Sequence, residues 1–210
     1  MNKLKASEII EKLRSIFGEP KCFLNHNNVF ELVCAVMLSA QTTDERVNMV
    51  TPVLFQKYPT PELLAKAEYN DVRSIIRSIG LANTKASNLI KMANVLVNEY
   101  NSEVPSDFKE LVSLPGVGRK TANVVSAVGF HIPAIAVDTH VYRTSYRLGF
   151  RKEADDLLKA EENLKKYIKR EDWIDAHHLL ILFGRNYCKA QNPKCDECPL
   201  KEYCCLKRGK

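Results

Sequence analysis

Long hydrophobic runs are missing from this 210-residue chain. The longest apolar run covers residues 32–38, which is far too short to cross a bilayer, and the N-terminal stretch alternates charged with apolar residues instead of forming the apolar centre of a signal peptide. The sequence also has no linker rich in proline, serine or glycine, and no internal repeat. We therefore expect a cytoplasmic protein that does not enter the membrane and whose domains, if there are several, pack closely.

Strand-like alternation of apolar and polar residues is absent as well. Apolar residues instead recur three and four positions apart, as Ala86, Leu89, Ala93 and Val97 do, which is the spacing that lines one face of a helix. Helix starts are predicted at Ser7, as an N-cap, and at Pro61. Further helices are expected to start at residue 119 and near residue 139. These patterns predict an all-α fold.

Positively charged residues outnumber negatively charged ones only slightly. The chain has 31 lysines and arginines against 25 acidic residues, a formal net charge of +6. This balance is compatible with a polyanionic partner and does not require one.

The cysteines are distributed unevenly. Five of the seven lie between residues 188 and 205, where Cys188, Cys195, Cys198 and Cys204 follow the pattern C-x6-C-x2-C-x5-C. Four thiolates suit either zinc or a [4Fe–4S] cluster, and the presence of only one short C-x2-C pair favours iron–sulfur modestly. Disulfides are disfavoured by the odd number of cysteines and by the expected intracellular location. Cys205 breaks the spacing and is not expected to be a ligand.

Two glycines mark a tight turn between two predicted helices. The string SDFKELVSL is followed by PGVG and then by RKTANVVSAVGF, which places Gly116 and Gly118 in the turn. Glycine permits positive φ and a close approach of the backbone to a ligand, and the first turn of the second helix presents N–H groups without intrahelical acceptors. The turn is therefore a candidate phosphate-binding site. A plain helical hairpin capped by glycine is the alternative.

Asp138 stands where an apolar segment meets a helix. Taken alone, it is best interpreted as an N-cap. The helix that starts at Arg119 carries the chain about 15 Å away, and the following extended segment spans at most about 26 Å, which is enough to return. Asp138 and Lys120 can therefore face one pocket.

Three strings together resemble the endonuclease III family of helix-hairpin-helix, iron–sulfur DNA glycosylases. They are LPGVGRKTANVV, VDTH and FGRNYCKAQNPKCDECPL. The resemblance implies that Lys120 is the nucleophile, that Asp138 is the catalytic carboxylate and that the four cysteines of the spacing pattern bind a [4Fe–4S] cluster. LSAQTTD and IGLANTKA resemble the family segments that enter the DNA helix, which points to Gln41 and Leu81.

The resemblance also implies a domain organisation and a DNA-binding surface. Residues 22–132 would form a six-helix domain with the helix-hairpin-helix motif, residues 1–21 and 133–210 would form a helical iron–sulfur domain, and DNA would lie in a groove between these two lobes. The residues expected to contact DNA are Gln41, Leu81, Gly116, Val117, Gly118, Arg119, His140, Lys189 and Lys194.

The function implied is that of a bifunctional DNA glycosylase and abasic-site lyase of base excision repair. It would remove oxidised pyrimidines and cleave the strand 3′ to the abasic site by β-elimination through a lysine Schiff base. Its partner would be double-stranded DNA with damaged bases or abasic sites, bound by a monomer, at the nucleoid if the source is bacterial. Alternatives are a thymine- or adenine-mismatch glycosylase of the same superfamily and a non-catalytic iron–sulfur DNA-binding protein. The adenine branch carries a catalytic glutamate where Ala35 stands.

Overall fold

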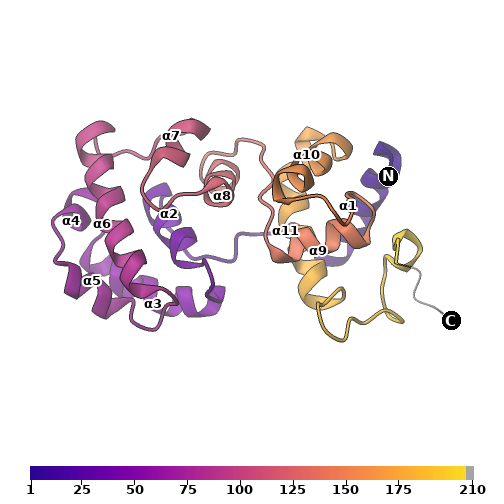
Figure 1. Cartoon of the computed structure of the whole chain (residues 1–210), viewed down its shortest axis with the longest axis horizontal. Helices are drawn as coiled ribbons and strands as arrows, with labels where there is room; N and C mark the ends of the chain where they lie inside the picture. Colours follow the sequence, from indigo (N-terminus) through magenta and orange to yellow (C-terminus); the bar gives the residue numbers. More distant parts are fainter. Residues whose placement is uncertain (207–210) are drawn as a thin grey trace. The chain divides into compact units, whose positions relative to one another are not determined.

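A computed structural model describes residues 1–206, and these residues form helices and loops without any strand (Figure 1). The predicted all-α fold is confirmed. None of the described helices is both long and apolar enough to cross a bilayer. The α-helices are α1 (Lys3–Phe17), α2 (Val29–Leu38), α3 (Asp44–Lys57), α4 (Pro61–Ala65), α5 (Tyr69–Ile75), α6 (Ala82–Glu99), α7 (Phe108–Ser113), α8 (Arg119–Gly129), α9 (Thr139–Arg147), α10 (Leu157–Tyr167) and α11 (Trp173–Asn186). Two 3-10 helices, η1 (Arg170–Asp172) and η2 (Lys201–Tyr203), complete the set.

The chain divides into two compact units. Cys22–Ile132 forms one, here called the hairpin unit, while Met1–Lys21 joins the chain from Pro133 onward to form the other, here called the cysteine unit. The hairpin unit contains α2 to α8, which is seven α-helices where the resemblance implies six. The shortest of them, α4, has five residues and forms little more than one turn.

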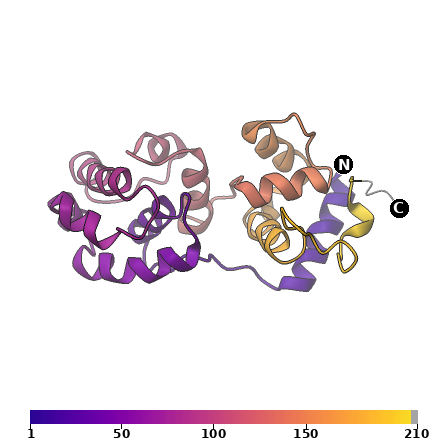
Figure 2. The ribbon, with the colours of Figure 1, turned by 60° about the horizontal axis from the view of Figure 1, so that its bottom comes forward.

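Helix α2 is the centre of the hairpin unit. Every residue of α2 from Phe30 onward is buried, as expected for a helix that is apolar on nearly all sides. It packs against α3, α6 and α8, and α6 in turn covers α4 and α5 (Figure 2). Gly129 allows the close approach of α8, because a Cβ atom there would lie 3.1 Å from side-chain atoms of both Leu32 and Val29.

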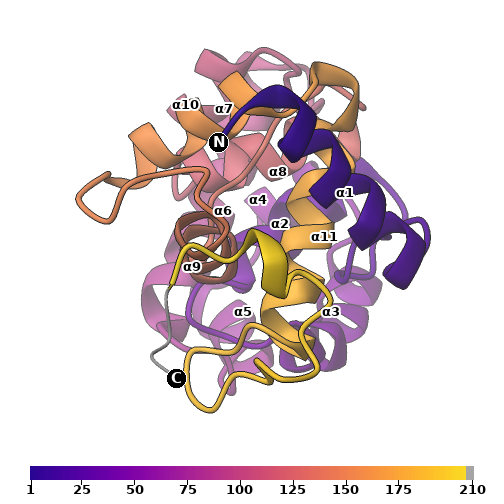
Figure 3. The same ribbon diagram turned by 90° about the vertical axis from the view of Figure 1, so that its right-hand side faces the viewer.

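The cysteine unit is built around α11, which packs against α9 and α1 (Figure 3). The buried face of α1 follows the spacing expected of an amphipathic helix and consists of Ala6, Ile9, Ile10 and Leu13.

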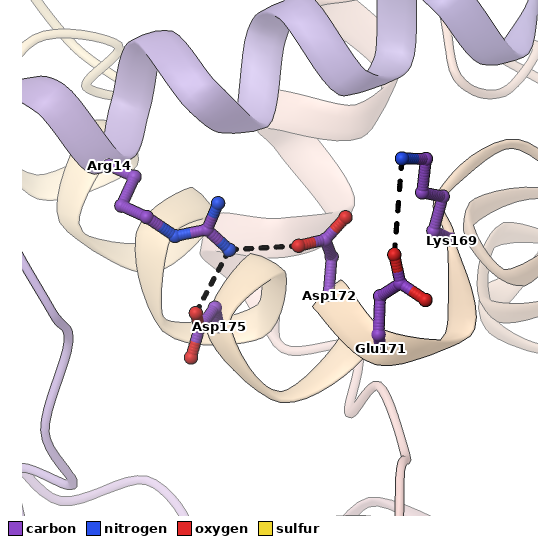
Figure 4. Close-up of polar contacts among 5 residues, drawn as sticks. All are labelled: Arg14, Lys169, Glu171, Asp172 and Asp175. Atoms are coloured by element: carbon purple, nitrogen blue, oxygen red, sulfur yellow. Dashed lines mark hydrogen bonds and ion pairs between the residues drawn. The ribbon is translucent and has the colours of Figure 1, made fainter.

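An ion-pair cluster ties α1 to the start of α11. The guanidinium of Arg14 donates to Asp172 at 2.8 Å and to Asp175 at 3.0 Å (Figure 4). The same figure shows Lys169 and Glu171, which are 3.9 Å apart and largely exposed. That exposed pair lies outside α1 and contributes little, whereas the Arg14 pairs are partly buried and add to the apolar burial that attaches α1.

Helix starts agree with the sequence predictions at some places and not at others. The predicted starts at Pro61 and Arg119 are confirmed. The prediction that Ser7 caps the first helix is wrong, because the N-cap is Asn2, five residues earlier, and its side chain accepts a hydrogen bond from the Lys5 N–H at 2.9 Å. Asparagine is among the strongest N-cap residues, and the cap lets residues 3–7 extend the helix by more than a turn.

Burial of α1 predicts a large difference between two leucines of the same helix. Leu13 is fully buried, whereas Leu4 is 71% exposed. Leu13→Ala should lower the free energy of unfolding by about 2–5 kcal/mol, because it leaves a cavity in the core of the cysteine unit. Leu4→Ala should change it by less than about 0.5 kcal/mol. Urea unfolding followed by circular dichroism measures both, and equal effects would contradict the packing of α1 described above.

Candidate active site

The predicted hairpin consists of α7, a glycine turn and α8. Gly116 has φ 80°, and a Cβ atom on it would lie 2.7 Å from Cε of Met37 and 2.8 Å from Cβ of Asn88. Leu114 and Val117 are buried, and the Val117 N–H donates to the Leu114 carbonyl at 3.0 Å. The inner side of the turn is therefore fixed in the core, and both the side chain and the N–H of Val117 are engaged within the turn.

The outer side of the turn is open. Gly118 is the N-cap of α8, and it is exposed together with Arg119 and Lys120. The first intrahelical bond runs from the Ala122 N–H to the Gly118 carbonyl at 2.9 Å, so the N–H groups before Ala122 have no acceptor within the helix. The guanidinium of Arg119 lies 5.2 Å from the ring centroid of Phe108 on α7. An exposed amine therefore adjoins a surface suited to binding a phosphate.

Asp138 is the N-cap of α9, as predicted from its position alone. Its Oδ1 accepts a hydrogen bond from the Val141 N–H at 2.7 Å, and the residue is half-buried. The preceding segment, residues 134–137, is buried, and Nδ1 of His177 lies 2.8 Å from the Ala136 carbonyl. The chain is thus held on both sides of Asp138, and the cap uses only Oδ1 of its carboxylate.

His140 follows in the first turn of α9 and contacts an arginine. Its Nδ1 lies 3.0 Å from Nη2 of Arg143. Arg143 also donates to the carbonyls of Gly184 at 3.0 Å and Cys188 at 2.9 Å. His140 is therefore half-buried within a network that joins α9 to the end of α11, and its predicted contact with DNA stays a prediction.

Four cysteines line a single pocket at the end of α11. They are Cys188, Cys195, Cys198 and Cys204, whereas Cys205 is not among the lining residues. None of the seven cysteines forms a disulfide within the described residues. Within residues 1–206, no group of three or more cysteine, histidine or acidic side chains is arranged to hold a single metal ion. Four thiols that line one pocket can each bind a different iron of a [4Fe–4S] cluster.

The surroundings of the cysteine pocket are partly cationic. Nη1 of Arg147 donates to Sγ of Cys188 at 3.4 Å and to the Lys189 carbonyl at 2.8 Å. Burial raises the pKa of the Cys198 thiol, and the three neighbouring thiols raise it further. The Cys205 N–H donates to the Arg147 carbonyl at 2.8 Å, which returns the chain to the end of α9. These contacts give the cysteine loop a defined position.

The two lysines of the cysteine loop that were predicted to contact DNA are both exposed. The backbone carbonyl of Lys189 accepts the hydrogen bond from Arg147, whereas its side chain is exposed. Nζ of Lys194 lies 4.0 Å from a carboxylate oxygen of Glu197, which makes a loose ion pair. Their side chains are accessible to a polyanion.

Gln41 and Leu81 share an unusual backbone conformation. Gln41 has φ 55° and Leu81 has φ 61°, and both residues are exposed, with Leu81 at 57%. Residues with a Cβ atom adopt this left-handed region infrequently and at a cost in energy. The sequence patterns did not indicate this conformation. They also missed Lys85, which is buried beside both loops.

The predicted site residues fall into two sets. The hairpin unit contains Gln41, Leu81 and the hairpin with Lys120, while the cysteine unit contains Asp138, His140 and the four cysteines. Lys120 and Asp138 therefore belong to different units, and their convergence on one pocket stays a prediction.

Comparisons with known proteins identify both units. Residues 34–170 match the model of the HhH-GPD superfamily of base excision DNA repair proteins, and residues 188–204 match the iron–sulfur binding domain of endonuclease III. The endonuclease III of Bacillus subtilis is 50% identical over 97% of this chain and 94% of its own length. The endonuclease III of Escherichia coli is 43% identical over 97% of this chain and 96% of its own length.

Solved structures agree with these relatives. A trapped covalent intermediate of an endonuclease III with DNA superposes with a TM-score of 0.93 at 48% identity, covering 97% of this chain and 96% of that one. A thermostable thymine-DNA glycosylase superposes with a TM-score of 0.86 at 22% identity over 96% of each chain, which shows a shared fold.

The geometry of the hairpin turn predicts different responses at its two glycines. Gly116→Ala should lower the free energy of unfolding by about 2–4 kcal/mol, because the methyl group meets Met37 and Asn88 and φ is positive. Gly118→Ala should change it by less than about 1 kcal/mol, because nothing lies within 4 Å of the new atom. Thermal and urea unfolding measure both variants. A tolerated alanine at position 116 would show that the turn is not anchored as described.

Proposed function

The chain belongs to the endonuclease III family of base excision DNA repair enzymes, and on that premise we propose that Lys120 and Asp138 carry out its reaction. It is a DNA glycosylase with abasic-site lyase activity, and it contains a [4Fe–4S] cluster. The observation that supports Lys120 best is its exposed position in the first turn of α8, directly after the glycine turn. The identities above 40% favour this activity over that of the thymine-DNA glycosylase, which shares only 22%.

The proposed reaction begins with an oxidised pyrimidine turned out of the helix. The neutral amine of Lys120 attacks C1′ of the sugar, and the glycosidic bond breaks so that the base leaves with the bonding electrons and takes up a proton. The amine then loses a proton, the C1′–O4′ bond breaks as the nitrogen forms the C=N bond of the Schiff base, and the ring oxygen takes up a proton. Removal of a C2′ proton breaks the C3′–O bond, which cuts the strand 3′ to the lesion. Covalent catalysis divides one difficult substitution into easier steps.

Asp138 is proposed to act on the charges and protons of these steps. A carboxylate near the sugar stabilises cationic character as the base departs, and it can accept and return the protons that the amine exchanges. Because the N-cap bond uses only Oδ1, the second carboxylate oxygen is not needed for the helix. The cap would hold the carboxylate in one orientation while it acts.

DNA is the partner, and we propose that it is double-stranded, with damaged bases or abasic sites, and that both units contact it. The turn with Gly116 and Gly118 would bind a phosphate through backbone N–H groups, Arg119 would add charge, and Gln41 and Leu81 would fill the space left by the flipped nucleotide. Val117 would contribute through the turn it stabilises. The same proposal assigns further contacts with DNA to His140, Lys189 and Lys194. We propose that the enzyme is cytoplasmic and acts as a monomer on DNA, at the nucleoid if the source is bacterial.

We propose that Cys188, Cys195, Cys198 and Cys204 bind the [4Fe–4S] cluster, since these four line one pocket. The cluster would supply four iron–thiolate bonds that cross-link the C-terminal loop. That loop carries Lys189 and Lys194, so the cross-links would fix both lysines relative to α9 and α11. In this proposal the role of the cluster is structural.

Borohydride trapping tests the nucleophile. Duplex DNA with a thymine glycol or an abasic site should give a covalent adduct with the wild type when borohydride reduces the Schiff base. Lys120→Gln should give no detectable adduct, and the control Lys109→Gln, an exposed lysine on α7, should match the wild type. An adduct at the wild-type level with Lys120→Gln would mean that another amine is the nucleophile.

The same assay examines the carboxylate. Asp138→Asn keeps an N-cap residue while removing the charge, so folding should be preserved and the rate of adduct formation should fall. An unchanged rate of adduct formation would mean that Asp138 serves only as the N-cap of α9 and has no part in the reaction.

Iron content tests the ligand set with two adjacent cysteines. Cys204→Ser should lower the bound iron and the visible absorption of the thiolate-bound cluster, because it removes a proposed ligand. Cys205→Ser should leave both unchanged, because Cys205 does not line the pocket. Iron assays and absorption spectra of the purified variants measure this. Loss of iron from the Cys205 variant alone would reverse the assignment.

A further inference from the structure

Lys85 is a buried lysine inside the hairpin unit. It is 6% exposed and lies in the first turn of α6, in line with the fully buried Leu89 and Met92. Burial lowers its pKa below the ordinary value for lysine. A buried ammonium is costly unless hydrogen bonds replace its water. The groups that accept hydrogen bonds from the Lys85 ammonium therefore indicate why a lysine is buried at this position.

The ammonium of Lys85 binds the end of α2 and the loop that follows. Its Nζ donates to the Leu38 carbonyl at 2.8 Å, to the Ala40 carbonyl, and to Oγ1 of Thr42 at 3.4 Å. Leu38 is the last residue of α2, where carbonyls lack intrahelical partners and a cation is favourable. The loop that carries Gln41 is thereby held on both sides of that residue.

The Leu81 loop is tied to the same lysine. The backbone N–H of Lys85 donates to the Leu81 carbonyl at 3.0 Å, and the Gly80 N–H donates to Oγ1 of Thr42 at 3.2 Å. A closed ring of bonds therefore runs from Leu81 through Lys85 to Ala40, then along the chain to Thr42, and back through Gly80. Lys85 thus contacts the Gln41 loop with its side chain and the Leu81 loop with its backbone.

The ring encloses two of the hairpin unit's residues that have positive φ, Gln41 and Leu81. Gln41 and Leu81 both have left-handed backbones, and Gly80 passes so close that a Cβ atom there would lie 3.0 Å from the Gln41 carbonyl. Strained conformations persist only where their surroundings hold them, and they concentrate at functional sites. The bonds of Lys85, together with the bond from Gly80 to Thr42, join the two loops that carry this pair.

We propose that Lys85 is a positioning residue that fixes Gln41 and Leu81 as a pair, so that both side chains enter the DNA helix together. This inference rests on the proposed function, in which these two side chains fill the space of the flipped nucleotide. In this proposal, opening a base-paired duplex requires the side chains of both Gln41 and Leu81. Reaction of Lys120 with an abasic site in single-stranded DNA requires no opening and so does not depend on them.

This difference between substrates separates positioning from a general role in stability. Single-turnover rates are compared on duplex DNA with a thymine glycol opposite adenine and on a single strand with an abasic site. Lys85→Met keeps the length of the side chain without its donors and should lower the duplex rate by about 10–100-fold. The single-strand rate should change by less than about 2-fold. Lys85→Arg, which retains charge and donors, should recover part of the duplex rate, and Lys91→Met, an exposed lysine of α6, should match the wild type.

Equal losses on both substrates, or no loss on either, would overturn the inference. If Lys85→Met does not fold, Thr42→Val takes its place in the test, because it removes the hydroxyl that joins the two loops. Thr42→Val should also slow the duplex reaction and leave the single-strand reaction unchanged. If the wild type forms no borohydride-reduced adduct with either substrate, the proposed function itself is refuted. If the wild type forms an adduct with both substrates and the variants slow the two reactions equally, only the proposed role of Lys85 is refuted.

Discussion

Helix ends are the places where this all-helical protein leaves backbone hydrogen-bonding groups without intrahelical partners, and the side chains proposed to act on DNA or bind the cluster lie at or next to such ends. Lys120 lies in the first turn of α8, and Asp138 caps α9. Lys85 occupies the end of α2, and the cysteine pocket follows the end of α11. The helix interiors form the core, so each site residue stands on an element that packing holds in place. The need to satisfy helix ends thus decides where ligands and substrates can be bound.

Local signals in the sequence were sufficient for much of this arrangement. The spacing of apolar residues predicted an all-helical fold, and glycine followed by a new periodic run predicted the start of α8 at Arg119. Asp138 was predicted as an N-cap from its position alone, and its side chain does accept from Val141. The error at Ser7 has a simple cause, because Asn2 is an equally strong cap and lies further upstream. The spacing of the four cysteines favours a cluster over zinc only modestly, the family resemblance favours it more firmly, and the structure places the four around one pocket.

Features that depend on tertiary packing could not be predicted in this way. A lysine on a helix is usually solvated, yet Lys85 lies on the buried stripe of α6 because three oxygen acceptors of the α2 end and its loop receive it. The only sequence signal is its position four residues before Leu89 on the same face. The left-handed backbones of Gln41 and Leu81 follow from contacts between their two loops, since neither residue favours that conformation by itself. Family resemblance pointed to both residues, whereas residue chemistry alone would have treated them as ordinary.

The central claim is that one amine, that of Lys120, forms the imine with damaged DNA. Its most direct measurement is mass spectrometry of the borohydride-reduced adduct after digestion of both protein and DNA. The account predicts that the sugar remnant is found on the peptide that contains Lys120, with a missed tryptic cleavage at that residue. A remnant located on another lysine or on the N-terminal amine would contradict the account, whatever the activity of the enzyme.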